Sequence, residues 1–189
     1  IANGVFSDDT FESNDASTEP GDAGDVPVQT ANLVLNVGNE DWFTFDNLTA
    51  ATPLAVEVHF DRTTYRTGIA LTVLNSVGTT IATGTPVGTT GPIRATTANL
   101  AVGTYTVRVR HTSGPSIPAY TLQVARPAQF LTNQVTGWTV GRPITIQYTA
   151  SGGLAPYTFA VADPGTLPAG LTFDSGTLRV TGTPTAVGD

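Results

Sequence analysis

Short stretches in which apolar and polar residues alternate run through most of the chain, and they predict β-strands. In PLAVEVHFD, the apolar side chains share one face, whereas Glu57, His59 and Asp61 share the other, so one face is expected to be packed and the other hydrated. Apolar residues nowhere keep helical spacing over the length of a helix. We therefore expect an all-β chain whose first part folds as a sandwich of short strands. The predicted strands of that part are residues 31–37, 41–48, 53–61, 69–75, 103–111 and 119–125.

The alternating pattern pauses at ARPAQF, where Arg126 and Pro127 are typical of a short linker. A second run of predicted strands follows, in GRPITIQYTA, PYTFAVAD and GLTFDSGTLRVTG. We expect two domains, a β-sandwich with an acidic N-terminal segment over residues 1–125 and a second sandwich over residues 126–189. The second domain is short enough that a single core would be only marginally stable.

Composition excludes several classes of function. The net charge is −7, all eight basic residues are arginines, and every one of them follows Asp61, whereas most of the fifteen acids precede it. A chain without a basic patch repels phosphate backbones, so no nucleic-acid partner is expected. The absence of cysteine excludes disulfides and thiol chemistry. No apolar run approaches the ~18 to 20 residues that span a bilayer, so direct membrane insertion is not expected.

No motif in the chain indicates catalysis. His59 and His111 are the only histidines. His59 lies on the polar face of its strand and is expected at the surface, and His111 ends a strand in the phase of its apolar residues, where it would cap the edge of the core. No serine stands in a nucleophile motif, and the sequence lacks H-E-x-x-H, a phosphate-binding loop and G-x-G-x-x-G. We expect the chain not to be an enzyme.

Two sets of motifs resemble known bacterial families. Residues 8–125 resemble the pre-peptidase C-terminal domain family through FESND, EDWFTF, PLAVEV, LTVLNSVGTTIA, AVGTYTVRV and YTLQV, in the order and spacing of that family. The resemblance implies a jelly-roll-like β-sandwich. Residues 137–188 resemble an Ig-like module of bacterial surface proteins through SGGLAPYTFAV, LPAGLTF and DSGTLRVTGTPT.

The Ig-like family continues into one more strand after the position of Gly188. Here only Asp189 follows, so the resemblance implies an incomplete Ig-like sandwich that lacks its last strand. Either the chain is cut short, or a neighbouring subunit supplies the strand to the open edge. The second alternative would make the protein a subunit of a polymer.

The resemblance also implies a calcium site. In calcium-binding relatives of the first family, an E-x-N-D segment binds Ca²⁺ together with an acid that precedes the D-W-F strand. The matching residues are Glu12, Asn14, Asp15 and Asp41. Carboxylate and amide oxygens closely spaced in a short irregular segment are typical calcium ligands.

The acidic segment departs from the family pattern at two positions. Thr10 and Gly38 stand where acids are expected, and Asp9, Asn39 or Glu40 would have to compensate. The alternative interpretation is that the segment is a solvated acidic arm, as most acid clusters are.

Two tryptophans and one glycosylation sequon are further candidate sites. Trp42 is expected to have a structural role in its strand, although a planar aromatic could also stack on a sugar, and Trp138 could do the same or join the two modules. Asn47 begins an N-L-T sequon that more simply marks a turn. Arg108 and Arg110 form a positive stripe on the outer face of their strand.

These features predict a non-catalytic, extracellular structural or adhesive protein of a bacterial surface, stabilised by calcium and assembled by strand addition in its most specific form. Its expected partners are other copies of itself or other surface proteins, with a protein or polysaccharide ligand. One alternative is an accessory region of a larger secreted protease or hydrolase that binds substrate or aids secretion. Another is a carbohydrate-binding module.

Overall fold

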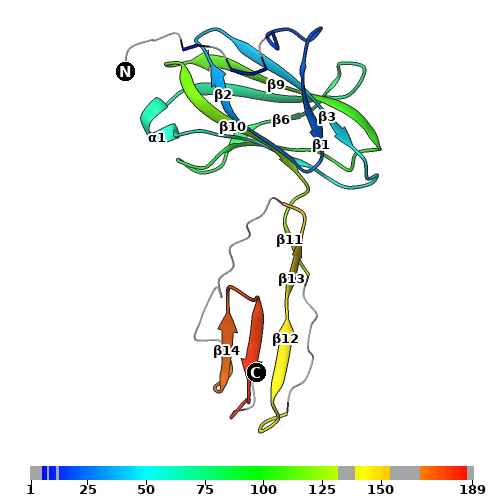
Figure 1. Ribbon diagram of the computed structural model, residues 1–189, viewed down its shortest axis with the longest axis vertical. Coiled ribbons are helices and arrows are strands. Elements are labelled where there is room, and N and C mark those ends of the chain that lie inside the picture. The colour runs from blue at the N-terminus through cyan, green and yellow to red at the C-terminus, as the bar shows by residue number, and fades with distance from the viewer. Residues whose placement is uncertain (1–5, 8, 12, 132–138, 154–166, 187–189) are drawn as a thin grey trace. The chain divides into compact units, whose positions relative to one another are not determined.

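The computed structural model describes residues 6–7, 9–11, 13–131, 139–153 and 167–186 (Figure 1). The chain divides into two compact units, Ile1–Pro127 and Ala128–Asp189. The first unit thus ends at Pro127, where the sequence pattern predicts an end at residue 125. The described part of each unit consists almost entirely of strands and connecting turns, which confirms the predicted all-β fold class.

Two five-stranded sheets make up the first unit, and successive strands mostly alternate between them. β1 pairs in parallel with β3, and all other neighbouring strands are antiparallel. The first sheet has the order β1 (Gly21–Asp25), β3 (Glu40–Asn47), β9 (Gly103–Ser113), β5 (Gly68–Leu74) and β6 (Thr80–Thr83). The second sheet has the order β2 (Val28–Leu35), β10 (Ile117–Ala125), β4 (Ala55–His59), β8 (Ile93–Thr96) and β7 (Thr85–Pro86).

The alternation in sequence decides which side chains meet between the sheets. In β4, Val56 and Val58 are fully buried, whereas Glu57 between them lies on the outer face. Each aliphatic side chain removed from water in this way contributes about 1.5–3 kcal/mol. The fully buried apolar residues are Leu33, Leu35, Phe43, Leu54, Val56, Val58, Val73, Ala95, Val107, Val109, Ile117 and Val124.

The chain crosses from one sheet to the other at both lateral sides of the sandwich. β1 continues through Val26 and Pro27 into β2, and β6 continues through Gly84 into β7. A Cβ at Gly84 would lie 2.6 Å from Cβ of Leu71 and 2.9 Å from Cγ2 of Ile93, so only glycine fits this crossing without displacing its neighbours. The edge strands of the two sheets are therefore joined to each other covalently on both sides.

A single short helix, α1 (Arg62–Tyr65), occurs in the part of the chain that the structure describes. It begins after Asp61, whose carboxylate accepts hydrogen bonds from the backbone N–H groups of Thr63 and Thr64, both at 3.0 Å. Hydrogen bonds from Thr63 and then Thr64 lower the pKa of Asp61 to about 2. Nη1 of Arg62 donates to the carbonyl of Gly91 at 2.8 Å and ties the helix to the loop before β8.

The second unit has a two-stranded and a three-stranded sheet. The first contains β11 (Gln129–Leu131) and β13 (Thr149–Ser151), and the second has the order β12 (Ile144–Gln147), β15 (Arg179–Gly182) and β14 (Leu171–Asp174). Its buried core comprises Ile146, Leu171 and Val180, with Phe173 packed against them. The strand predicted in PYTFAVAD lies outside the described residues.

In the second unit, the backbone of Gly170 lies in close contact with the backbone of Thr183. A Cβ at Gly170 would lie 2.1 Å from the carbonyl oxygen of Thr183, and the backbone of Gly170 has a φ of +90°. The amide of Thr183 donates to the carbonyl of Gly170 at 3.0 Å. Position 170 therefore requires glycine for both space and conformation.

Candidate functional site

The acidic N-terminal segment lies across one end of the first unit and is tied to both sheets. Oδ2 of Asp9 accepts a hydrogen bond from the amide of Val34, on β2, at 2.8 Å, and its Oδ1 accepts from the amide of Phe11 at 2.8 Å. The ring of Phe11 packs edge-on against Phe43, on β3, with the ring centroids 5.7 Å apart. This segment is therefore docked against the sandwich and is not a free arm in the structure.

Asn14 is the most unusual residue of this segment because it is only 1% exposed and its side-chain amide has no partner. Among the residues that the structure describes, neither Oδ1 nor Nδ2 of Asn14 has a hydrogen-bond partner, although both atoms are buried. The carbonyl of Asn14 accepts from the amide of Trp42 at 2.8 Å, which places Asn14 beside the start of β3, where Asp41 stands. A buried amide without a partner is costly, and such groups in folded proteins usually mark a bound water or ion.

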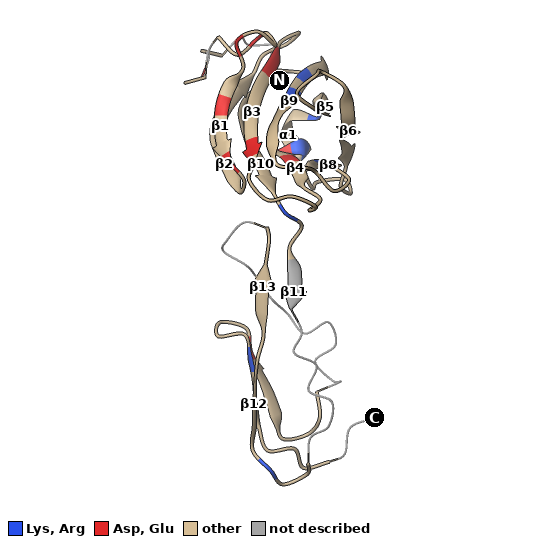
Figure 2. Ribbon diagram, turned by 90° about the vertical axis from the view of Figure 1, so that its right-hand side faces the viewer, with Lys and Arg blue, Asp and Glu red and all other residues tan. Residues whose placement is uncertain are grey.

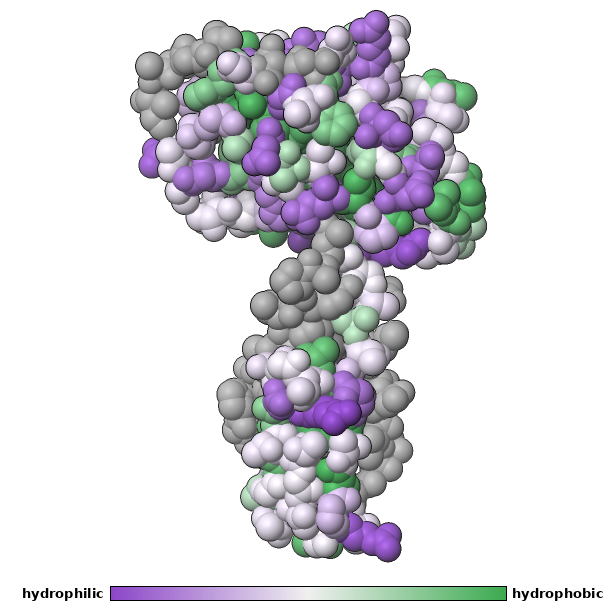
Figure 3. Space-filling view, viewed as in Figure 1, coloured by the Kyte–Doolittle hydropathy of each residue, from purple (hydrophilic) through white to green (hydrophobic). Residues whose placement is uncertain are grey.

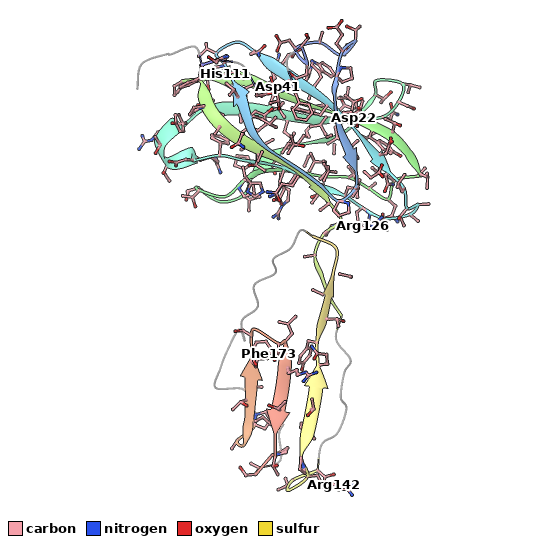
Figure 4. The ribbon with its side chains drawn as sticks, in the orientation of Figure 1. Asp22, Asp41, His111, Arg126, Arg142 and Phe173 are labelled. Carbon is pink, nitrogen blue, oxygen red and sulfur yellow. The ribbon has the colours of Figure 1, made fainter. Side chains whose placement is uncertain are left out.

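Asp41 faces the interior at the same end of the sandwich. It is 1% exposed, and its Oδ2 accepts a hydrogen bond from the hydroxyl of Tyr120, on β10 of the opposite sheet. Figure 4 shows Asp41 and His111 at this end of the first unit and Arg126 at the other end. A buried carboxylate is stable only when charges or hydrogen bonds compensate for its lost hydration.

Two further candidate calcium ligands, Asp15 and Asn39, are hydrogen-bonded to each other at the same end of the first unit. Nδ2 of Asn39 donates to Oδ1 of Asp15 at 2.9 Å, and the carbonyl of Asn39 accepts from the amide of His111 at 3.0 Å. His111 is buried, with Nδ1 accepting from the amide of Gly38 at 3.2 Å and Nε2 donating to the carbonyl of Gly114 at 3.0 Å. His111 therefore holds two loops at the edge of the core, as its position in the strand predicts.

The residues present fit a calcium ion in their chemistry. Asn14 offers an unpartnered buried oxygen, and Asp15 and Asp41 offer carboxylates within the same hydrogen-bonded end of the sandwich. Glu12 lies outside the described residues, and within the described ranges no three His, Asp or Glu side chains gather closely enough to hold a metal without other ligands. A site here would therefore need amide and backbone oxygens as well, which calcium accepts.

Trp42 has the structural position that its strand predicts. It is 9% exposed, its Nε1 donates to Oε1 of Glu40 at 3.0 Å, and the guanidinium carbon of Arg108 lies 5.3 Å from its ring centroid. A ring this buried offers no face on which a sugar could stack. Arg110 is exposed beyond Arg108 on β9, and Trp138 lies outside the described residues.

The asparagine of the N-L-T sequon, Asn47, is inaccessible in the folded chain. Asn47 is fully buried, and its Nδ2 donates to the carbonyl of Ala101 at 2.8 Å. A glycan attached to this nitrogen would have to break that hydrogen bond and open the end of β3. The sequon therefore marks the end of the strand.

A second cluster of polar side chains, Glu57, His59 and Arg94, lies on the outer face of the second sheet. Oε2 of Glu57 is 2.7 Å from Nε2 of His59, and Oε1 accepts a hydrogen bond from Nε of Arg94. The hydrogen bond with His59, and then the Arg94 guanidinium, lower the pKa of Glu57 against the effect of its partial burial, which raises it. The alternation placed Glu57 and His59 on one face, but nothing in the sequence indicated Arg94 as their neighbour.

Comparisons with known proteins bear on both units. The family model described as Putative Ig domain matches residues 127–189, about a third of the chain. Among solved structures, the chain is similar to the pre-peptidase C-terminal domain of a collagenase from Bacillus anthracis, with 20% identity, a TM-score of 0.45, and coverage of 56% of this chain and 94% of that one. No curated protein matches the chain.

Both matches name the families that the sequence resembles. Modules of these families usually occur in secreted or surface proteins. No helix within the described ranges is long and apolar enough to cross a membrane.

Proposed function

We propose that the chain is a non-catalytic structural module of a secreted or surface protein of bacteria, and that a calcium ion clamps the N-terminal segment of its first sandwich. The observation that carries this proposal is the buried, unpartnered side-chain amide of Asn14 beside the start of β3. A hard cation would give the buried Oδ1 of Asn14 a partner.

The charges at this end support the same interpretation. Asp41 is buried at the start of β3, and Oδ1 of Asp15 accepts a hydrogen bond from Asn39, in the loop before β3. A divalent cation among these groups would compensate for the burial of the Asp41 carboxylate. It would also attach the N-terminal segment to β3, in addition to the hydrogen bond between Asn14 and Trp42.

A thermal melt of the purified chain in calcium and in excess chelator tests the clamp. A ligand at about a hundredfold excess over its dissociation constant stabilises the folded state by about 2.7 kcal/mol, so the midpoint should rise by several degrees. Asp15→Asn and Asp41→Asn should reduce this rise, because both substitutions remove a charged ligand and keep the shape of the side chain. Asp22→Asn is the matched control, since Asp22 is an exposed acid on β1 outside the proposed site.

The outcomes separate clearly. A rise in the midpoint that Asp15→Asn and Asp41→Asn reduce, and that Asp22→Asn leaves intact, supports the clamp. An unchanged midpoint in calcium, or an equal rise in all four proteins, contradicts it, and the acidic segment is then held by its hydrogen bonds alone.

We further propose that copies of the chain associate at a surface. Acidic residues lie on β1 and β3 of the first unit, and arginines lie on α1 and β9 (Figure 2). Charges of both signs on one surface can pair between two copies of the chain. Light scattering at low and high salt tests this association. Particles that grow at low salt and dissociate at high salt support it, and a monomer under both conditions contradicts it.

A further inference from the structure

One continuous row of polar side chains crosses all five strands of the second sheet. Residues that pair across antiparallel strands point to the same face of a sheet. Gln123 of β10 pairs with both Gln29 and Glu57, Glu57 pairs with Arg94, and Arg94 pairs with Thr85. The neighbours of these residues along β4, β8 and β10 are buried, so the row lies on the outer face.

Arg94 in this row is held in one orientation while its terminal nitrogens stay available. Its Nε donates to Glu57, whose side chain is only 15% exposed, whereas the side chain of Arg94 is 45% exposed. Within the described part of the chain, neither Nη1 nor Nη2 of Arg94 has a hydrogen-bond partner. A guanidinium fixed through Nε presents its two remaining nitrogens side by side, the geometry that binds a carboxylate or sulfate with two hydrogen bonds.

Further hydrogen-bonding groups surround this guanidinium. His59, which pairs with Thr121, contacts Glu57 through Nε2, and its side chain is 39% exposed. Gln123 adds a side-chain amide next to Glu57 in the row, and Gln29 adds another on the far side of Gln123. Amides and hydroxyls of this kind donate to and accept from the hydroxyl groups of sugars.

The row carries one guanidinium that can meet an anionic ligand. Glu57 is the only acid in the row, and its charge is matched by Arg94. Most other acids of the first unit lie in the N-terminal segment and on β1 and β3, whereas Asp61 follows β4 of the second sheet (Figure 2). Figure 3 shows polar residues spread over the visible surface of this unit, with no broad apolar area.

We infer that the outer face of the second sheet binds an acidic polysaccharide, with Arg94 holding a carboxylate or sulfate group of a sugar and Gln123 and Gln29 bonding to neighbouring hydroxyls. The row runs across the strands, so it is an extended surface that fits a chain of sugars rather than a single small anion. The site is independent of calcium, because it lies on the sheet face and not at the end that holds Asn14.

Titration calorimetry with a galacturonic acid oligomer tests this site, both in calcium and in chelator. The same oligomer with its carboxylates methyl-esterified is the matched neutral probe, and an oligoglutamate of similar length is the acidic peptide probe. Arg94→Gln should weaken binding of the acidic oligomer by about tenfold or more, since it removes a charged pair of hydrogen bonds. Arg110→Gln, at an exposed arginine on the first sheet, should change it less than about twofold.

Amide shifts in NMR spectra give a second measurement that does not depend on how well a variant folds. The acidic oligomer should shift amides of β4, β8 and β10 in the wild-type chain and leave those of β3 and β9 unchanged. Equal binding of the acidic and esterified oligomers, or binding that Arg94→Gln does not weaken, would overturn the inference. Tighter binding of oligoglutamate than of the sugar acid would also overturn it, and the surface would then be a site for acidic peptides.

Discussion

Asp41 and Tyr120 join the two sheets of the first unit, because the hydroxyl of Tyr120 on β10 donates a hydrogen bond to the carboxylate of Asp41 on β3. The two residues are 79 positions apart in the sequence, and both are buried. A hydrogen bond to a buried carboxylate contributes more than one at the surface because water cannot replace the donor.

Tyr120→Phe should lower the free energy of unfolding by about 1.5–3 kcal/mol, since it removes a donor to a charged group and leaves the ring in place. Urea unfolding measures the loss. The control is Tyr105→Phe, whose hydroxyl donates to the carbonyl of Ala101 at 3.1 Å near the surface. This control should lose about 1 kcal/mol or less. Equal losses of unfolding free energy in the two variants would show that the hydrogen bond between Tyr120 and Asp41 contributes no more than one at the surface.

Gly84→Ala should destabilise the first unit by about 1–3 kcal/mol, because the added methyl group meets Leu71 and Ile93 at less than normal contact distance. Thermal unfolding measures the change. Thr83→Ala, at the exposed neighbouring position, should stay within about 0.5 kcal/mol of the wild type. A Gly84→Ala chain as stable as Thr83→Ala would mean that the crossing from β6 to β7 is loosely packed.

Asp61→Ala should destabilise the start of α1 at pH 7, because the backbone amides of Thr63 and Thr64 lose their acceptor. Asp61→Asn keeps an acceptor oxygen and should lose less. The pKa of Asp61 is lowered to about 2 in the folded chain. The charged carboxylate therefore stabilises the fold at pH values above the pKa of an ordinary aspartate, which is about 4. This stabilisation is lost as the pH falls from about 4 through 2.

Melts of the Asp61 variants at pH 7 and at pH 2 check both parts of this prediction. The gap in midpoint between the wild type and Asp61→Asn should narrow at pH 2, where about half of the wild-type carboxyl groups are protonated. A gap that is the same at both pH values would contradict a role for the charge.

Gly170→Ala should unfold the second unit, since its methyl group would overlap the carbonyl of Thr183 and its backbone φ of +90° disfavours alanine. NMR amide signals from β14 and β15 should lose their dispersion, while those from β3 and β9 should keep it. Ser175→Ala, at an exposed turn position, is the control and should leave both sets intact. Retained dispersion in Gly170→Ala would show that the backbone can move apart at this point.

The strands that alternate in sequence were predictable, and β1 was not. β4 and β5 lie within one or two residues of the predicted stretches because a single buried face fixes their pattern. β1 has the sequence GDAGD, without apolar alternation, and it forms through parallel backbone pairing with β3 while Phe11 packs over Gly21. Such a strand depends on contacts between distant segments, which no local pattern contains.

The candidate sites divide in the same way. The acidic segment was evident from its density of charge, but the burial of Asn14 depends on the hydrogen bond that its carbonyl accepts from Trp42. Glu57 and His59 share a face in any alternating strand, whereas Arg94 reaches Glu57 from 37 residues away through the pairing of β8 with β4. Local chemistry was therefore predictable, and its partners were not.

In each sheet of the first unit, a strand that pairs with two earlier strands comes late in the sequence. β9 stands between β3 and β5, and β10 stands between β2 and β4, so the earlier strands have no complete sheet to join until residue 125 has been synthesised. Pairings this distant along the chain make folding slow. A chain that emerges gradually, from a ribosome or through a secretion pore, would thus stay unfolded until its first unit is nearly whole, which suits export in an extended form.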